Sequence, residues 1–298
     1  MEKYGKQRKI EDDKTDPTGF LNKAREHQSK FRLENLNLLD YDEYGNYLTE
    51  NDAKKGLNFY NNFGIFTVVK EYIKFNKNIY QNMLRSEHIP FNLFIPLDNN
   101  KIYLKNVFNE IFNGEIKLID LLKIEYAPQP KEKYLNDKTS FDVYIEYTRD
   151  DDKKGIIGIE IKYTERGYKI GKKECIEINN YESIYYEITN KSNVYKDEII
   201  IKLQDDDYRQ IWRNHLLGES ILIKNTDKFK YFTSITFYPQ KNEHFNIVSK
   251  QYKNFLKEEH KDKCLFITYE KLMELLSKHC PDDNYKKWIE YLNTRYIF

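Results

Sequence analysis

The chain has 298 residues, of which 40% are hydrophobic and 33% are charged, and its formal net charge is +1. With only 7 Pro and 11 Gly, this composition is that of an ordered globular protein and excludes a collagen-like or disordered chain. Bulk charge gives no support to nucleic-acid binding, although a carboxylate cluster can cancel part of a basic groove.

Two features of the sequence concern location and cysteine chemistry. No apolar run approaches the roughly eighteen residues of a membrane span, and the N-terminus lacks the apolar segment of a signal peptide, so we expect a cytoplasmic protein. Cys175, Cys264 and Cys280 are odd in number and have no CxxC spacing. We therefore expect three free thiols and neither a disulfide framework nor a zinc knuckle.

The N-terminal part of the chain is polar and predicts helices. Residues 1–60 read as an accessory helical segment with one helical pattern over 22–39. Apolar residues at helical spacing predict a second helix over 66–84. The main domain would then occupy residues 61–298.

After residue 109 the apolar period changes to two. Three neighbouring antiparallel strands are predicted, at 117–127, 140–148 and 155–164. Further elements follow in alternation: a helix at 207–217, a strand at 230–239, a helix at 247–258, a strand at 264–268 and two closing helices. This order predicts an α/β fold with a mixed β-sheet flanked by helices.

The second and third predicted strands alternate cleanly between apolar and polar side chains. In 140–148, we expect Phe141 and Val143 to face the core while Asp142 lies on the opposite, available face. In 155–164, the same alternation places Glu160 and Lys162 together on the polar face, about 6 to 7 Å apart along the strand. A turn near residue 151 would set Asp142 directly opposite Glu160.

Two opposed carboxylates repel each other unless a cation lies between them, and a divalent metal is the usual solution. We expect Asp142 and Glu160 to bind Mg²⁺, with Mn²⁺ as a substitute, and the main-chain carbonyl of Ile161 to complete the ligand set. Lys162 would orient the attacking water or neutralise developing charge in phosphodiester hydrolysis. These residues are therefore the predicted catalytic group.

A charged hairpin face is also ordinary, and a D…ExK pattern arises easily in a chain that is one-third charged. What favours a site is that Glu160 and Lys162 interrupt the most hydrophobic, strand-like segment of the sequence. On the helix at 207–217, Gln210, Arg213 and Asn214 share a polar face that either contacts phosphate and the metal site or is simply solvated.

The sequence resembles the PD-(D/E)XK nuclease superfamily, and within it a bacterial family assigned to restriction endonucleases. The resemblance covers roughly residues 57–245 and rests on the segments FNLFIPL, EYAP, SFDVYIEY, GIIGIEIKYTE and YRQIWRNHLLGES. It implies a restriction-endonuclease-like fold with an N-terminal helical extension, and Asp142, Glu160 and Lys162 as the active site. Phe141 stands where the superfamily name has proline, which is often absent.

The resemblance also implies a metal-dependent DNA endonuclease of the restriction or anti-phage defence type. DNA would be its partner, and a homodimer and a cognate methyltransferase or other defence-system partner are further expectations. By this resemblance Ser86, Glu87 and Asn92 become secondary candidates for the cleft. Glu125, on the strand before the hairpin, is a candidate for a further carboxylate, and for each of these four residues a structural role is the more common alternative. Lys169, Lys172 and Lys173 follow the third predicted strand and are candidates for contact with the DNA backbone, with a solvated loop as the more common alternative.

Three other interpretations stay open at this stage. The chain could be an RNA or structure-specific nuclease, because nothing in the sequence reads a 2′-hydroxyl. It could be a non-catalytic DNA-binding or scaffold protein that keeps the fold. It could also be a structural protein whose hairpin charges form surface ion pairs.

Overall fold

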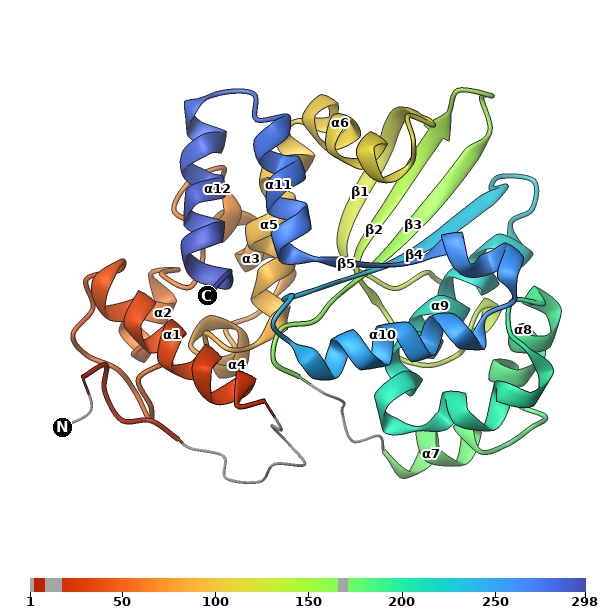
Figure 1. Ribbon diagram of the computed structural model, residues 1–298, viewed down its shortest axis with the longest axis horizontal. Coiled ribbons are helices and arrows are strands. Elements are labelled where there is room, and N and C mark those ends of the chain that lie inside the picture. The colour runs from red at the N-terminus through yellow and green to blue at the C-terminus, as the bar shows by residue number, and fades with distance from the viewer. Residues whose placement is uncertain (1–2, 9–17, 166–170) are drawn as a thin grey trace.

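A five-stranded mixed sheet forms the centre of the molecule in the computed structural model, which describes residues 3–8, 18–165 and 171–298 (Figure 1). The strand order is β1-β2-β3-β4-β5, antiparallel from β1 to β3 and parallel from β3 to β5. The strands are β1 (Ile116–Tyr126), β2 (Phe141–Arg149), β3 (Lys154–Ile161), β4 (Tyr231–Tyr238) and β5 (Cys264–Thr268). The predicted mixed sheet is confirmed.

Helices cover both faces of this sheet (Figure 1). One face carries the helices from the two ends of the chain: α1 (Phe20–Glu34), α2 (Glu50–Lys54), α3 (Ile65–Tyr72), α4 (Lys77–Tyr80), α5 (Ile89–Asn99), α6 (Lys101–Ile111), α11 (Tyr269–Lys278) and α12 (Asp283–Tyr296). The other carries α7 (Lys172–Ile178), α8 (Ile184–Ser192), α9 (Asp206–Lys224) and α10 (Glu243–Phe255). Short 3₁₀ helices lie at η1 (Ser86–His88), η2 (Lys131–Lys133), η3 (Asp197–Gln204) and η4 (Glu258–Lys263).

The hairpin of β2 and β3 has the predicted register. Val143 pairs with Ile159 and Tyr144 with Gly158, and continuing this ladder by one residue sets Asp142 opposite Glu160. Val143 and Ile159 are fully buried in the core under α5 and α6. The alternation of apolar residues and the turn at 150–152 together account for this register, because a slip of one residue would bring the charged positions into this core.

The opposite face of the hairpin, which we expected to be available, is covered by helices except at the strand ends, where the side chains of Asp142 and Glu160 line a cleft. Tyr144 and Ile156 lie in a second core with residues of α8, α9 and α10. The parallel connections from β3 to β4 and from β4 to β5 carry these helices across that face, so both faces are buried. Phe141 also departs from the predicted alternation: its ring covers Gly158, where an added Cβ would lie 2.3 Å from Cε1 of Phe141.

The helix predicted over 66–84 is two short helices, α3 and α4. Ile73 ends α3 in an extended conformation, and Asn76 caps α4 by accepting a hydrogen bond from the backbone N–H of Asn78. A continuous helix would need helical backbone angles at this position, but the capping asparagine is extended and starts a new helix instead. The predicted helix is therefore divided in two. The helix predicted over 22–39 is shorter, since α1 ends at Glu34.

The first sixty residues share one core with the C-terminal helices. Ala24 and Phe31 of α1 are buried in the same cluster as Trp288 of α12. Gln28 donates hydrogen bonds to the hydroxyl of Tyr163 and to a backbone carbonyl of α12. The N-terminal helices thus brace the chain just after β3, while the boundary at residue 60 stays a prediction.

All three cysteines are free, as expected: Cys175 is exposed, Cys264 is buried and Cys280 is half-buried. Among the described residues, none of the helices combines the length and the apolar character that crossing a membrane requires.

Gly218 lets α9 approach β4, and this contact predicts the effect of a substitution. A Cβ at this position would lie 1.9 Å from Cζ of Phe232. We expect Gly218→Ala to destabilise the protein by about 1 to 3 kcal/mol through overpacking, although alanine favours a helix. Urea unfolding measures this change. Gly171→Ala, where the nearest atom lies 3.8 Å away, should leave the midpoint almost unchanged; equal midpoints for both variants would contradict the close approach.

Candidate active site

A cleft of about 430 Å³ lies where β3 ends and β2 begins. It brings together side chains from β2, β3, α9, α7 and the chain around η1 and 138–140. Its lining residues are Arg85, Ser86, Glu87, Lys138, Thr139, Ser140, Asp142, Glu160, Lys162, Glu165, Glu174, Gln210, Arg213 and Asn214. The three predicted catalytic residues therefore share one cleft.

Asp142 is held against β3 by a backbone hydrogen bond. Its Oδ2 accepts from the N–H of Ile161 at 2.6 Å, and the side chain is half-buried. Burial raises the pKa of Asp142 well above its usual range, and the neighbouring carboxylates of Glu160 and Glu125 add to this effect. An ionised Asp142 is thus a costly group that a nearby cation would stabilise.

Glu160 is almost completely buried and has hydrogen-bond donors on both carboxylate oxygens. Lys162 Nζ lies 2.9 Å from Oε1, and Gln210 Nε2 donates to the same oxygen at 2.5 Å. Asn214 Nδ2 donates to Oε2. Charge pairing and two amides together compensate the burial of this carboxylate.

The helix α9 supplies both amides because residues four apart lie on the same helical face. Gln210 also accepts a hydrogen bond from Lys162 through Oε1, so this one amide links the lysine and the glutamate. Arg213, on the same helix, pairs with Asp137 at 2.7 Å and with Glu174 at 3.2 Å. The sequence left open whether this polar face contacts the site or is simply solvated. In the structure, Gln210 and Asn214 contact the site.

Glu125 and Glu87 add negative charge beside these residues. Burial raises the pKa of Glu125 to about 7, with further contributions from Glu160 and Glu87. The backbone of Glu125 has a φ of 52°, an uncommon angle that interrupts the regular strand next to the site. Glu87 pairs with Arg85 Nε at 2.8 Å. Four carboxylates thus influence one another around the end of the hairpin.

Some predicted residues lie elsewhere. Asn92 is fully buried and does not line the cleft; it donates to the hydroxyl of Tyr296 at 2.9 Å and accepts from the backbone of Tyr60 at 2.8 Å. Lys172 is exposed at the start of α7. Lys169 lies outside the described residues, and so does the side chain of Lys173.

Glu165 and Asp137 belong to the site or support it, but the sequence alone did not predict them. Glu165 lines the cleft and accepts hydrogen bonds from the backbone N–H groups of Ser86, Tyr163 and Thr164. It ends the segment GIIGIEIKYTE, so its place just after the strand was a usable signal. Asp137 holds Arg213 from a turn-rich loop, where no periodicity marks a partner.

The donor set fits a divalent cation. Asp142 and Glu160 offer carboxylate oxygens at the ends of neighbouring strands, and the carbonyl of Ile161 lies between Glu160 and Lys162 in the chain. Hard oxygen ligands of this kind suit Mg²⁺ or Mn²⁺. In the described part of the chain, no three His, Cys, Asp or Glu side chains are grouped to hold a metal, so water or substrate would have to complete the coordination.

The charge balance in the cleft predicts that Asp142→Asn stabilises the metal-free protein. The amide keeps an oxygen acceptor for Ile161 N–H but removes a carboxylate whose pKa is raised by burial and by Glu160. When the pKa of a carboxyl group is higher in the folded protein than in the unfolded chain, the free energy of unfolding falls as the pH rises from the unfolded-state pKa to the folded-state pKa. The gain, on the order of 1 kcal/mol, should therefore be larger at pH 8 than at pH 5.

Thermal unfolding in EDTA measures this gain, with Asp137→Asn as the matched control. Burial alone would raise the pKa of Asp137, but Arg213 and hydrogen bonds from Tyr185 and Thr139 outweigh burial and lower it. The control should therefore lose stability at neutral pH. A loss of stability in both variants at pH 8 would contradict the proposed repulsion around Asp142.

One family of known proteins matches most of the chain. The family model of the PD-(D/E)XK nuclease superfamily matches residues 12–298, which includes most of the N-terminal segment and all the residues that line the cleft. No curated protein and no solved structure matches the chain. The chain belongs to the PD-(D/E)XK nuclease superfamily.

Proposed function

We propose that this protein is a divalent-metal-dependent endonuclease that hydrolyses DNA phosphodiester bonds, with Asp142, Glu160 and Lys162 as its catalytic residues. The observation that carries the proposal is the convergence of these three side chains in one cleft, from two strands paired in a single register. Membership of a nuclease superfamily supports the class of reaction.

In this proposal Asp142, Glu160 and the carbonyl of Ile161 hold Mg²⁺, with Mn²⁺ as a substitute. When bound, such an ion acts as a Lewis acid on the phosphate and lowers the pKa of water. The ammonium of Lys162, 2.9 Å from Glu160, is placed to orient a water or to neutralise charge on the phosphate. Its burial makes this electrostatic effect stronger than it would be in open solvent.

Gln210 and Asn214 would act as positioning residues. Both donate hydrogen bonds to the carboxylate of Glu160. Their side chains are neutral amides, so they do not supply the negative charge that a carboxylate ligand gives to a metal. Groups that orient a ligating carboxylate commonly change metal affinity or activity by roughly 10- to 100-fold. Glu125, Glu87 and Ser86 remain secondary candidates, because they lie around the same carboxylates or line the cleft.

Contacts with DNA are proposed for the basic and polar groups at the cleft. Arg213 and Asn214 line it, and Lys172 and Lys173 belong to α7, whose Glu174 also lines it. Lys169 is proposed from its place in the sequence just after the third predicted strand. A restriction or anti-phage role and a methyltransferase or other defence partner are further proposals that rest on the sequence resemblance. A homodimer is proposed from the symmetry of paired cuts, and a cytoplasmic location from the cysteine usage.

The nuclease proposal predicts metal-dependent cleavage that depends on Lys162. Plasmid DNA, phage DNA and a structured RNA should be incubated with the protein in Mg²⁺, Mn²⁺ or EDTA. Loss of the ammonium in Lys162→Met should lower the cleavage rate at least about 100-fold, and Asp142→Asn should do the same by weakening metal binding. Lys271→Ala, on the exposed side of α11, is the control and should cleave normally.

Equal cleavage by the wild type and both cleft variants would show that the activity belongs to a contaminant and would overturn the assignment. Cleavage of RNA but not DNA would show that the substrate is RNA, and the assignment of the three catalytic residues would stand. Metal-independent cleavage would contradict the role of Asp142 and Glu160.

The positioning proposal predicts that Asn214→Leu weakens metal binding without abolishing it. Leucine has a similar size but leaves Glu160 Oε2 without the amide donor that now contacts it. The Mn²⁺ concentration for half-maximal cleavage should rise about 10-fold or more, while saturating Mn²⁺ restores much of the rate. Asn284→Leu, at an exposed position of α12, is the matched control. An unchanged Mn²⁺ requirement in Asn214→Leu would show that Asn214 does not position Glu160.

A further inference from the structure

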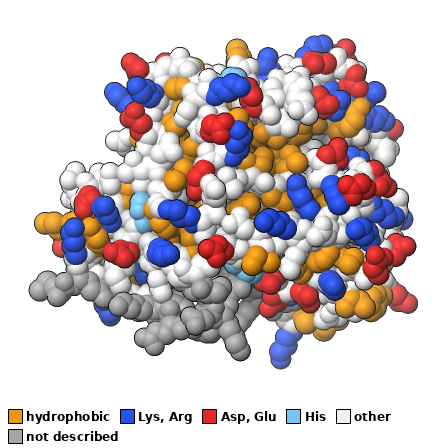
Figure 2. Space-filling model, viewed as in Figure 1, with side chains coloured by type: hydrophobic (Ala, Val, Ile, Leu, Met, Phe, Trp, Pro, Cys, Tyr) orange, Lys and Arg blue, Asp and Glu red, His pale blue; other side chains and the backbone are white. Residues whose placement is uncertain are grey.

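A nucleic acid bound at the cleft has to find its positive charge locally. The chain has a net charge of only +1, and Figure 2 shows Lys and Arg side chains interspersed with Asp and Glu side chains over the face that it draws. Among the described residues, five carboxylates line the cleft: Glu87, Asp142, Glu160, Glu165 and Glu174. Because a polyanionic strand gains affinity from each phosphate that a Lys or Arg neutralises, the accessible cations of the cleft decide how it holds a strand.

Three of the four basic residues that line the cleft in the described chain are already paired. Lys162 is buried and lies 2.9 Å from Glu160. Arg213 makes two ion pairs, and its side chain is only 3% exposed. Arg85 is half-buried and donates to Glu87 through Nε at 2.8 Å. A phosphate would have to compete with a carboxylate for each of these cations.

The fourth basic residue, Lys138, is different. Its side chain is exposed, and its ammonium has neither an ion pair nor a hydrogen bond to any residue that the structure describes. Four residues of chain separate it from Asp142, so the two Cα atoms lie at most about 14 Å apart. The phosphates of one strand follow each other every 3.4 Å or so along a duplex. A phosphate bound by Lys138 would therefore lie within a few nucleotides of one at the catalytic residues.

The loop that carries Lys138 is held in place by a buried ion pair. The carboxylate of Asp137 accepts a hydrogen bond from the hydroxyl of Tyr185 at 2.6 Å and one from the N–H of Thr139 at 2.8 Å, and Arg213 Nη2 lies 2.7 Å from it. Burying such a pair is costly, so stability is a weak reason for its presence. Its effect here is to fix the backbone on both sides of Lys138 while the ammonium stays exposed.

The cleft continues past this loop into a further cavity of about 380 Å³. Lys138 and Glu174 line both spaces, so the cavity adjoins the cleft. Leu135 and Ile184 give the cavity an apolar part, and Lys131, which is exposed, also lines it. A strand that passes the catalytic residues on the side of Lys138 thus meets a hollow rather than a closed wall.

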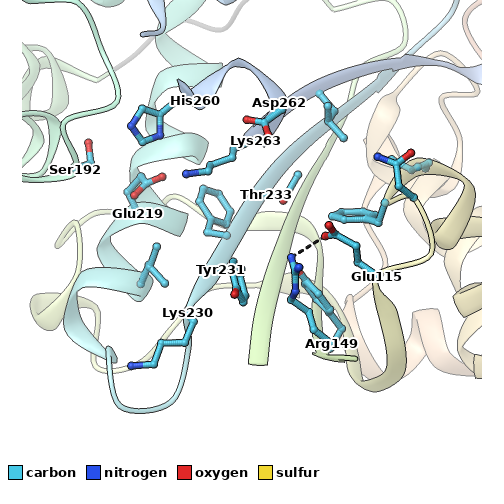
Figure 3. A pocket seen from close by; sticks show the side chains of 17 residues that line it. Glu115, Arg149, Ser192, Glu219, Lys230, Tyr231, Thr233, His260, Asp262 and Lys263 are labelled. Carbon is cyan, nitrogen blue, oxygen red and sulfur yellow. Dashed lines mark hydrogen bonds and ion pairs between the residues drawn. The ribbon is translucent and has the colours of Figure 1, made fainter. Parts of the chain in front are cut away.

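The larger cavity at the start of β4, of about 580 Å³, differs in its cations (Figure 3). Arg149 pairs with Glu115 at 2.7 Å, and Lys230 donates to a backbone carbonyl at 2.6 Å. Burial raises the pKa of Glu219 to about 7, and the nearby charge of Lys263 acts in the opposite direction. The basic groups in this wall therefore already have partners, whereas Lys138 at the catalytic cleft has none within the described chain.

We propose that Lys138 binds a phosphate of the substrate beside the scissile bond, and that the strand passes over it from the cleft into the adjoining cavity. The inference rests on the proposed nuclease function and names a group that holds its substrate. A phosphate contact of this kind fixes the position of a nucleic acid without reading its sequence. Arg213 supports the contact as a positioning residue, because it holds Asp137 next to Lys138.

Binding of a fluorescent DNA duplex, measured by anisotropy at several KCl concentrations, tests this contact. Ca²⁺ replaces Mg²⁺ as a hard cation for the cleft oxygens, and electrophoresis afterwards checks that the probe is intact. Lys138→Gln should weaken binding and lower the slope of log K against log salt by about 0.9, the value for one phosphate contact. Lys138→Arg should keep the slope. The control is Lys133→Gln, at an exposed lysine that donates to Asn225 and lines neither space, and its slope should equal that of the wild type.

Cleavage kinetics in Mg²⁺ separate this inference from the nuclease proposal. In Lys138→Gln the loss of kcat/KM should appear mainly in KM, because the contact holds substrate and transition state alike. A lower slope in Lys138→Gln would support the contact even if the wild type cleaves nothing, and the catalytic proposal alone would fail. A wild-type slope in Lys138→Gln, an equal change in Lys133→Gln, or no binding of DNA by the wild type would overturn the inference, whether or not the protein cleaves DNA.

Discussion

The structure depends on the burial of negative charge where two strands meet. Asp142 and Glu160 lie opposite each other at the end of the hairpin of β2 and β3, and Glu125 lies close enough to raise the pKa of Asp142. Folding alone would not favour such a group, because like charges in a partly buried site oppose each other. Lys162 and the amides of α9 compensate Glu160, whereas Asp142 has, among the residues that the structure describes, only the N–H of Ile161 and a more distant lysine. A bound divalent cation, as proposed, would relieve this repulsion.

The fold holds this charge in place from both faces. The core beneath the sheet fixes the register of β2 and β3, so that the carboxylates meet at the strand ends. The parallel connection to β4 brings α9 across the other face, where Gln210 and Asn214 reach Glu160. On the far side, Tyr269 donates to the carbonyl of Lys162 at 2.7 Å and fixes the chain as it leaves β3. A rigid scaffold of this kind supports a site whose residues must be placed accurately.

Much of this site could be predicted from the sequence. The period-two pattern predicted the strands and the faces of their side chains, and the turn expected near residue 151 predicted the register in which Val143 pairs with Ile159. The amide face of α9 was also visible as a helical pattern. What the sequence could not show was how much of the second face of the hairpin the flanking helices bury, since that depends on where a long connection packs. Nor could it show the pairing of Arg213 with Asp137, because loops carry no periodic signal. Asn92 was misplaced because an asparagine that satisfies buried backbone groups resembles one that lines a cleft.

The proposed metal site is tested most directly by a crystal structure of the protein with Mn²⁺, using anomalous scattering to locate the ion. We expect an anomalous peak in the cleft, in contact with the carboxylates of Asp142 and Glu160 and with the carbonyl of Ile161. Such a peak should be absent in crystals of Asp142→Asn grown under the same conditions. An empty cleft in the wild type at saturating Mn²⁺, or an ion bound only by other residues, would contradict the central claim.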